Sequence, residues 1–143
     1  MLTCCRSRKS FLLTILGTVS SLPLSAQPLL DSPEAITGTM ERLSIRLPSS
    51  VAESAAVRKP LEELTREHCD QQAIVGLGKA LDQAGYRREA ATAHVSFSDS
   101  CGGHASSLRI AVNTLIKLSD YASAATIASR LIELEPFSYT GYF

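Results

Sequence analysis

An internal repeat in the second half of the sequence constrains the fold of this chain more than any other feature. Residues 77–90 align with residues 111–124 without a gap, and the alignment continues on both sides at the same offset. The coinciding pairs are mostly apolar or small: Ile74 and Leu108, Leu81 and Leu115, Ala90 and Ala124, Phe97 and Leu131, Gly102 and Pro136. The period of the repeat is the separation of residue 77 from residue 111, and this length fits two helices joined by a turn. We therefore expect an all-α fold in which antiparallel helix hairpins at 71–104 and 105–138 stack on one another.

The residues of the two units resemble the tetratricopeptide repeat (TPR) in order and spacing. The matching residues are Leu77, Gly78, Leu81, Gly85 and Ala90 in the first unit, and Leu115, Tyr121, Ala124, Leu131, Leu134 and Pro136 in the second. The departures are Tyr86 one place early, Arg87 in place of an aromatic residue, Gly102 in place of proline, Ala111 and Val112 in place of Leu-Gly, and Ser119 in place of the turn glycine. The resemblance implies an α-solenoid of about two TPR-like units, a module that mediates protein–protein contacts or serves as a scaffold.

Small residues occur where such helices approach each other or turn. Gly78 and Ala90 allow two helices of a hairpin to pack closely, and Gly85 can adopt the positive φ of a turn between them. His94 stands where the family usually has a core aromatic residue. We expect His94 to have a packing role in the interior.

The resemblance also implies a ligand-binding groove lined by the first helix of each unit. Its candidate residues here are Lys79, Arg109, Asn113 and Lys117, of which the last three are spaced four apart and share one stripe of a helix. In the family, a cation followed four residues later by Asn can form part of a carboxylate clamp. The stripe could therefore hold a peptide carboxylate or an acidic segment. The alternative is a face that is merely solvated.

Residues 1–26 have the order of a secretory signal peptide. Arg6, Arg8 and Lys9 precede a short apolar run at 11–24, and Leu24-Ser25-Ala26 resembles a signal-peptidase site. The run is shorter than the about 20 residues of a membrane span. We expect cleavage before Gln27, a periplasmic or secreted protein, and no stable membrane span after cleavage. A short uncleaved anchor is the alternative.

The charge balance bears on the class of partner. The chain has 14 basic and 14 acidic residues. Removing 1–26 takes away three basic residues and no acidic one, which leaves 11 basic and 14 acidic residues. A general nucleic-acid binder needs a surplus of Lys and Arg that faces phosphates. We therefore expect a protein or peptide partner and no nucleic acid.

Two cysteines, Cys69 and Cys101, remain after 1–26, and they flank the first hairpin. An antiparallel hairpin brings its two ends together, and an exported protein meets oxidising conditions, so a disulfide between them is expected. Two histidines adjoin the pair. A zinc site of His68, Cys69, Cys101 and His104 is the alternative, although adjacent residues such as His68 and Cys69 rarely converge on one ion. We expect no metal and no cofactor.

The segments outside the two units have weaker patterns. Residues 27–48 contain Pro28, Pro33, Pro48 and Gly38 without a sustained helical period, which indicates a linker with an extended piece at 42–47. Residues 49–70 are predicted to be a preceding helical segment in which Pro60 occupies the first turn of a helix. Residues 139–143 are interpreted as the start of an incomplete third repeat or as a tail.

No motif for catalysis occurs in the chain. We find no Gly-x-Ser-x-Gly, no phosphate-binding loop and no His-Glu-x-x-His. We therefore expect a binding or scaffolding module and not an enzyme. The alternative is the non-catalytic N-terminal repeat domain of a longer exported enzyme that is truncated here.

Overall fold

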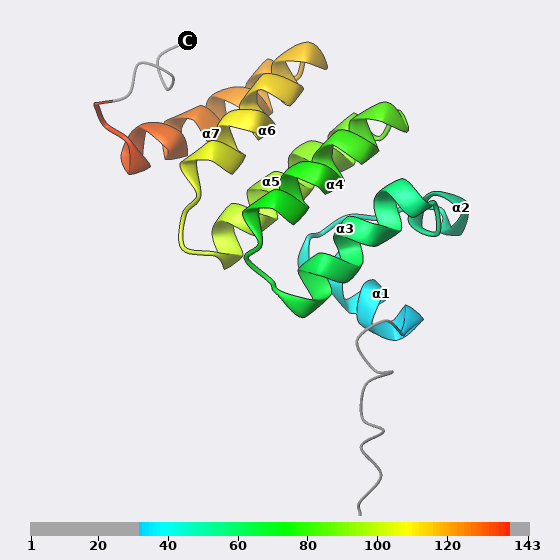
Figure 1. Ribbon diagram of the computed structural model, residues 1–143. Coiled ribbons are helices and arrows are strands. Elements are labelled where there is room, and N and C mark those ends of the chain that lie inside the picture. Colours follow the sequence, from blue (N-terminus) through cyan, green and yellow to red (C-terminus); the bar gives the residue numbers. More distant parts are fainter. Residues whose placement is uncertain (1–31, 138–143) are drawn as a thin grey trace, which may run out of the picture.

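The fold of the described part of the chain is entirely helical. The computed structural model describes residues 32–137, so the predicted signal peptide and the predicted tail at 139–143 lie outside the described residues. Seven helices and no strand occur in this range (Figure 1): α1 Pro33–Arg42, α2 Ser49–Ala52, α3 Ala55–Arg66, α4 Gln71–Gln83, α5 Arg87–Ser100, α6 Ala105–Lys117 and α7 Tyr121–Leu134. The all-α prediction is confirmed.

The helices repeat with the period of the sequence. Helix α6 has the same length as α4 and lies one repeat period after it, that is, as far along the chain as residue 111 lies after residue 77. Helix α7 has the same relation to α5. The turns agree as well, because Gly85 has φ 87° and Ser119 has φ 58°. Ser119 therefore adopts the left-handed conformation that glycine adopts in the first unit, although a side chain makes it less favourable. Leu81 and Leu115 are both buried, as the repeat predicts.

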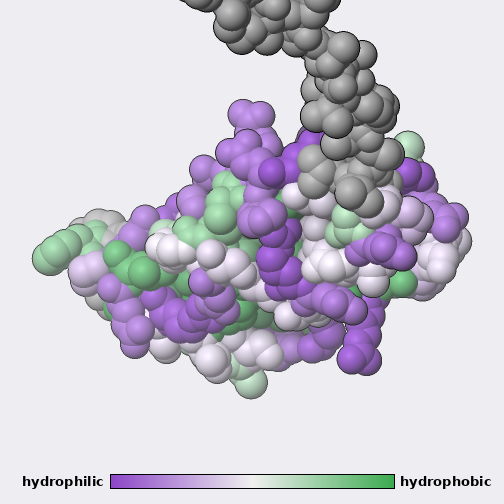
Figure 2. Space-filling model, turned by 90° about the horizontal axis from the view of Figure 1, so that it is seen from below, coloured by the Kyte–Doolittle hydropathy of each residue, from purple (hydrophilic) through white to green (hydrophobic). Residues whose placement is uncertain are grey.

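Successive helices pack side by side as three stacked hairpins (Figure 1). The close pairs are α1 with α3, α3 with α4, α4 with α5, α5 with α6 and α6 with α7. Helix α3 packs against α4 just as α5 packs against α6. Helices α1 and α3 therefore form an irregular hairpin ahead of the two regular hairpins, α4–α5 and α6–α7. Seen from below, the surface is mostly hydrophilic, with small apolar areas toward the end of the molecule where α7 lies (Figure 2).

Two clusters of apolar side chains hold the stack together. The larger one joins Leu43 and Ile45 to side chains of α3, α4 and α5, including Leu61, Leu77 and Phe97. The smaller one joins Ala91 of α5 to residues of α6 and α7, namely Ala111, Val112, Leu115 and Ala124, with Val95 and Ile127 packed against it. No described helix has the length and apolar character that a membrane span requires.

The interpretation of 27–48 as a linker is wrong from Pro33 onward. Helix α1 begins at Pro33, where proline suits the first turn, and the side chain of Ser32 accepts a hydrogen bond from the N–H of Ala35. Two contacts fix α1 to α3: Thr39 Oγ1 lies 2.8 Å from Thr65 Oγ1, and Arg42 Nη2 donates to the carbonyl of Leu64 at 2.9 Å. The predicted extended piece is a connection without strand structure, in which Leu43 and Ile45 are buried.

The prediction that Pro60 occupies the first turn of a helix is wrong, because Pro60 lies inside α3. A proline there removes one hydrogen bond and disturbs the carbonyl four residues earlier. That carbonyl belongs to Ala56, an exposed residue that water can reach. Pro60 itself is buried and packs toward Gly76, where a Cβ built on the glycine would lie 3.6 Å from Pro60 Cγ. Packing against α4 therefore compensates for the lost helical hydrogen bond.

Candidate functional site

The predicted groove residues lie on a surface made by the first helices of the two regular hairpins, α4 and α6. We call this surface the groove face and define it by exposed side chains of the two helices: Gln72, Val75, Lys79 and Gln83 of α4, and Asn113, Ile116 and Lys117 of α6. Lys79 corresponds to Asn113 in the repeat, and Gln83 corresponds to Lys117. Two large apolar side chains are exposed among these polar ones, Val75 at 44% and Ile116 at 39%. The groove face therefore offers both apolar area and charge to a ligand.

A cleft of about 330 Å³ opens beside Lys79 between α3 and α4. Small residues of both helices form its floor, including Pro60 and Gly76, and Lys59, Glu63, Lys79 and Gln83 stand around it. Sequence reasoning did not assign Lys59 and Glu63 to the site. The packing of α3 on α4, which brings Lys59 and Glu63 to the cleft, could not be derived from the repeat alone.

Arg109 is placed differently from the other three predicted residues. Its Nη2 lies 2.7 Å from Oε2 of Glu135, the C-cap residue of α7, and both side chains are a little over one-third exposed. Its Nε is buried and has no hydrogen-bond partner in the described part of the chain. Arg109 is thus held against the end of α7, while Asn113 and Lys117 extend from later turns of α6 into solvent.

The unpaired positive charge of the groove face comes from Lys79 and Lys117. Neither forms an ion pair with a carboxylate among residues 32–137, whereas Asp82 on the same side of α4 is paired with Arg87 at 2.7 Å. A carboxylate that approaches the face would meet two ammonium groups and the amide of Asn113. Hydrogen bonds between charged partners are stronger than neutral ones.

Cys69 and Cys101 form the predicted disulfide across the open end of the α4–α5 hairpin, with 5.6 Å between their Cα atoms. Their sulfurs are bonded to each other, so neither is a thiolate that could bind zinc. The alternative set of His68, Cys69, Cys101 and His104 is therefore not formed. No group of three or more His, Cys, Asp or Glu residues suited to a metal occurs between residues 32 and 137. The His104 ring instead lies 5.3 Å from the Phe97 ring.

His94 has the interior position expected of it. It is 1% exposed, and a Cβ built on Gly78 would lie 2.3 Å from its Nε2, so the imidazole occupies the space that the glycine leaves. Its Nδ1 is buried without a hydrogen-bond partner among the described residues. Burial disfavours the charged ring and lowers the pKa of His94 from 6.5 to about 4.

Acid should therefore weaken the fold through His94. Above pH 6.5 the ring is neutral in both states, and between pH 6.5 and about 4 only the unfolded chain takes up the proton, so stability falls as the pH falls. We expect this group to account for a loss of about 3 kcal/mol between pH 7 and pH 4. Urea unfolding at a series of pH values measures the loss. In His94→Leu, this part of the pH dependence should be absent; an equal slope in both proteins would contradict the assignment.

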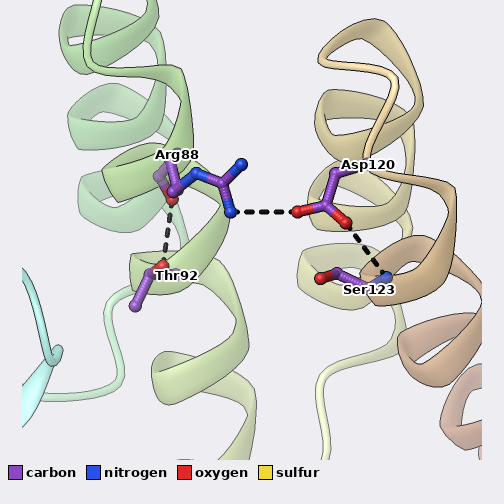
Figure 3. A network of polar contacts seen from close by, with 4 residues as sticks. All are labelled: Arg88, Thr92, Asp120 and Ser123. Carbon is purple, nitrogen blue, oxygen red and sulfur yellow. Dashed lines mark hydrogen bonds and ion pairs between the residues drawn. The ribbon is translucent and has the colours of Figure 1, made fainter.

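Polar contacts between α5 and α7 set the two regular hairpins in register (Figure 3). Arg88 Nη1 lies 2.9 Å from Asp120 Oδ2, and Asp120 Oδ1 accepts from the N–H of Ser123 to cap α7. Hydrogen bonds from Ser123, with a contribution from Arg88, lower the pKa of Asp120. At the other end of the two helices Arg130 pairs with Asp99, and between α4 and α6 Gln71 donates to Ser106 at 2.8 Å.

Comparisons of the chain with protein-family models, with curated proteins and with solved structures find no match. The groove face combines apolar and charged side chains. Its features are two exposed apolar side chains, two unpaired lysines and an adjoining cleft.

Proposed function

We propose that this chain is an exported helical-repeat module, TPR-like in its pattern, whose groove face binds a protein segment that carries a free carboxylate. The observation that supports this most is the combination of Val75 and Ile116, exposed in corresponding first helices, with Lys79 and Lys117 unpaired beside them. Apolar contacts would supply affinity, and the two ammonium groups with Asn113 would select the carboxylate.

The disulfide supports the exported part of the proposal. Disulfides persist in oxidising compartments and are rare in the cytosol. Cys69 and Cys101 are bonded in the folded domain, in the hairpin that carries Lys79. Lys79, one of the proposed binding residues, and the disulfide therefore belong to the same hairpin.

A peptide array tests the binding proposal directly. Each peptide is presented twice, once with a free and once with an amidated carboxyl terminus, and acidic side chains are likewise compared with their amides. We expect binding to peptides with the free carboxylate, and a loss of at least about tenfold in affinity in Lys79→Ala/Lys117→Ala, since hydrogen bonds to charged groups contribute about 1.5–3 kcal/mol.

Arg58→Ala is the matched control for this experiment. Arg58 is an exposed cation of α3 that lies outside the groove face and pairs with Glu62. Its replacement removes one exposed positive charge away from the groove face, where the double variant removes two, and should leave peptide affinity unchanged. Equal binding to free and amidated peptides, or an equal effect of both variants, would contradict the proposed recognition of a carboxylate.

A further inference from the structure

The cleft between α3 and α4 owes its shape to small residues on the facing sides of both helices. The two helices lie side by side (Figure 1), and the lining residues follow helical spacing on each of them. The small or compact lining residues are Ala55, Ala56 and Pro60 of α3 and Gly76 and Ala80 of α4. The volume of about 330 Å³ is at the low end for a ligand site, which suits a single side chain of a larger partner.

The charge around this cleft is net positive. Lys59 of α3 and Lys79 of α4 line it, and both are exposed. The ion pairs among residues 32–137 involve neither lysine. Glu63 is the one acidic side chain among the described residues that line the cleft. A group that fits here therefore places a single negative charge at the rim and apolar atoms on the floor.

The last residue of a peptide chain meets both requirements at once. Its carboxylate and its side chain are bonded to the same Cα atom, so the carboxylate can stay at the rim beside Lys79 while an apolar side chain enters the cleft. An acidic side chain cannot do this, because its carboxylate is at the tip and would be desolvated on an apolar floor. Glu63 also repels a second carboxylate in the cleft.

We propose that the cleft between α3 and α4 holds the side chain of an apolar last residue, with the terminal carboxylate of the bound segment beside Lys59 and Lys79. This inference rests on the proposed function and adds that the recognised carboxylate is a chain terminus that follows an apolar residue. Lys79 belongs to both the cleft and the groove face, so the rest of the segment lies on the groove face. Helix α3 precedes both units of the repeat, so the repeat pattern alone does not predict this specificity.

Pools of short peptides that are random except for a fixed last residue test the proposal, with dissociation constants measured by fluorescence anisotropy. Pools that end in Leu, Ala, Gly or Asp carry a free carboxyl terminus, and a further Leu pool is amidated. We expect the free Leu pool to bind at least about tenfold more tightly than the Gly, Asp and amidated pools, with the Ala pool between them. Glu63→Gln should raise the affinity of the Asp pool, because it removes the repulsion.

Ala56→Leu fills the cleft from the side of α3, at an exposed position where a larger side chain is compatible with folding. This variant should weaken the Leu pool at least about tenfold and leave the Gly pool unchanged, since glycine places no side chain in the cleft. The control is Ala125→Leu, which adds the same group at an exposed position of α7 and should leave every pool unchanged. Circular dichroism verifies that the variants being compared are folded.

The outcomes separate this inference from the proposed function. Free pools that bind more tightly than the amidated pool, but equally for every last residue, overturn the role of the cleft and leave the proposed function standing. An unchanged affinity of the Leu pool in folded Ala56→Leu has the same meaning. If no pool distinguishes the free from the amidated terminus, both proposals are overturned.

Discussion

Replacing both Cys69 and Cys101 by serine is expected to lower the free energy of unfolding by about 3–4 kcal/mol, according to the chain-entropy estimate for a loop of this length. The bond joins residue 69, just before α4, to residue 101, just after α5, so it closes the whole first regular hairpin. Small domains have small cores, and total stabilities of native proteins are only about 5–15 kcal/mol. The loss should therefore be a large fraction of the stability of this protein.

Urea unfolding of the oxidised chain, with and without reductant, measures this effect. The reduced chain should unfold near the midpoint of the double serine variant, and reductant should leave that variant unchanged. Oxidised and reduced chains with the same midpoint would show that the bond does not stabilise the hairpin.

The second large effect is expected from Gly78→Ala. Helix propensity alone favours alanine over glycine in the middle of α4 by about 1 kcal/mol. The added Cβ, however, would lie 2.3 Å from Nε2 of His94 and 3.1 Å from its Cδ2, and that ring is fully enclosed. The ring would have to shift within the packed interior, so the variant should be destabilised by about 2–3 kcal/mol through overpacking.

Gly76→Ala provides the control in the same helix. Its Cβ would be in ordinary contact, 3.6 Å from Pro60 Cγ, so the gain in helix propensity should remain and the variant should be as stable as the parent or more so. Thermal unfolding of both variants, with Gly78→Ala/His94→Ala as the double mutant, separates the two effects. Removing the His94 ring should abolish the penalty, so that Gly78→Ala becomes neutral or stabilising in the His94→Ala background. A destabilising Gly78→Ala that is unaffected by His94→Ala would contradict a clash between these two residues.

The sequence predicted the regular hairpins because their information is local and repeated. Leu81 and Leu115 are apolar at corresponding positions, and both are buried. The prediction that Cys69 and Cys101 meet required only that two helices of similar length run antiparallel. His94 was expected in the interior because of its position in the unit, although the sequence did not indicate that Gly78 makes room for it.

Features that depend on contacts between distant segments were missed. Helix α1 contains Gly38 and three residues of low helix propensity, Thr37, Thr39 and Ile36, so its own sequence does not show a helical period. Contacts with α3 stabilise it. The ion pair between Arg109 and Glu135 could not be predicted either, because it depends on where the end of α7 lies relative to the first turns of α6.

The central claim is that two helix hairpins with the same apolar pattern pack against each other, and methyl nuclear Overhauser effects of Leu81 and Leu115 test it most directly. Leu115 of α6 should show contacts with the methyl group of Ala91 of α5, which belongs to the other hairpin, whereas the contacts of Leu81 with Phe97 report on the first hairpin alone. If Leu115 instead shows contacts only with residues of its own hairpin, α6 and α7, the two hairpins do not stack and the account is wrong.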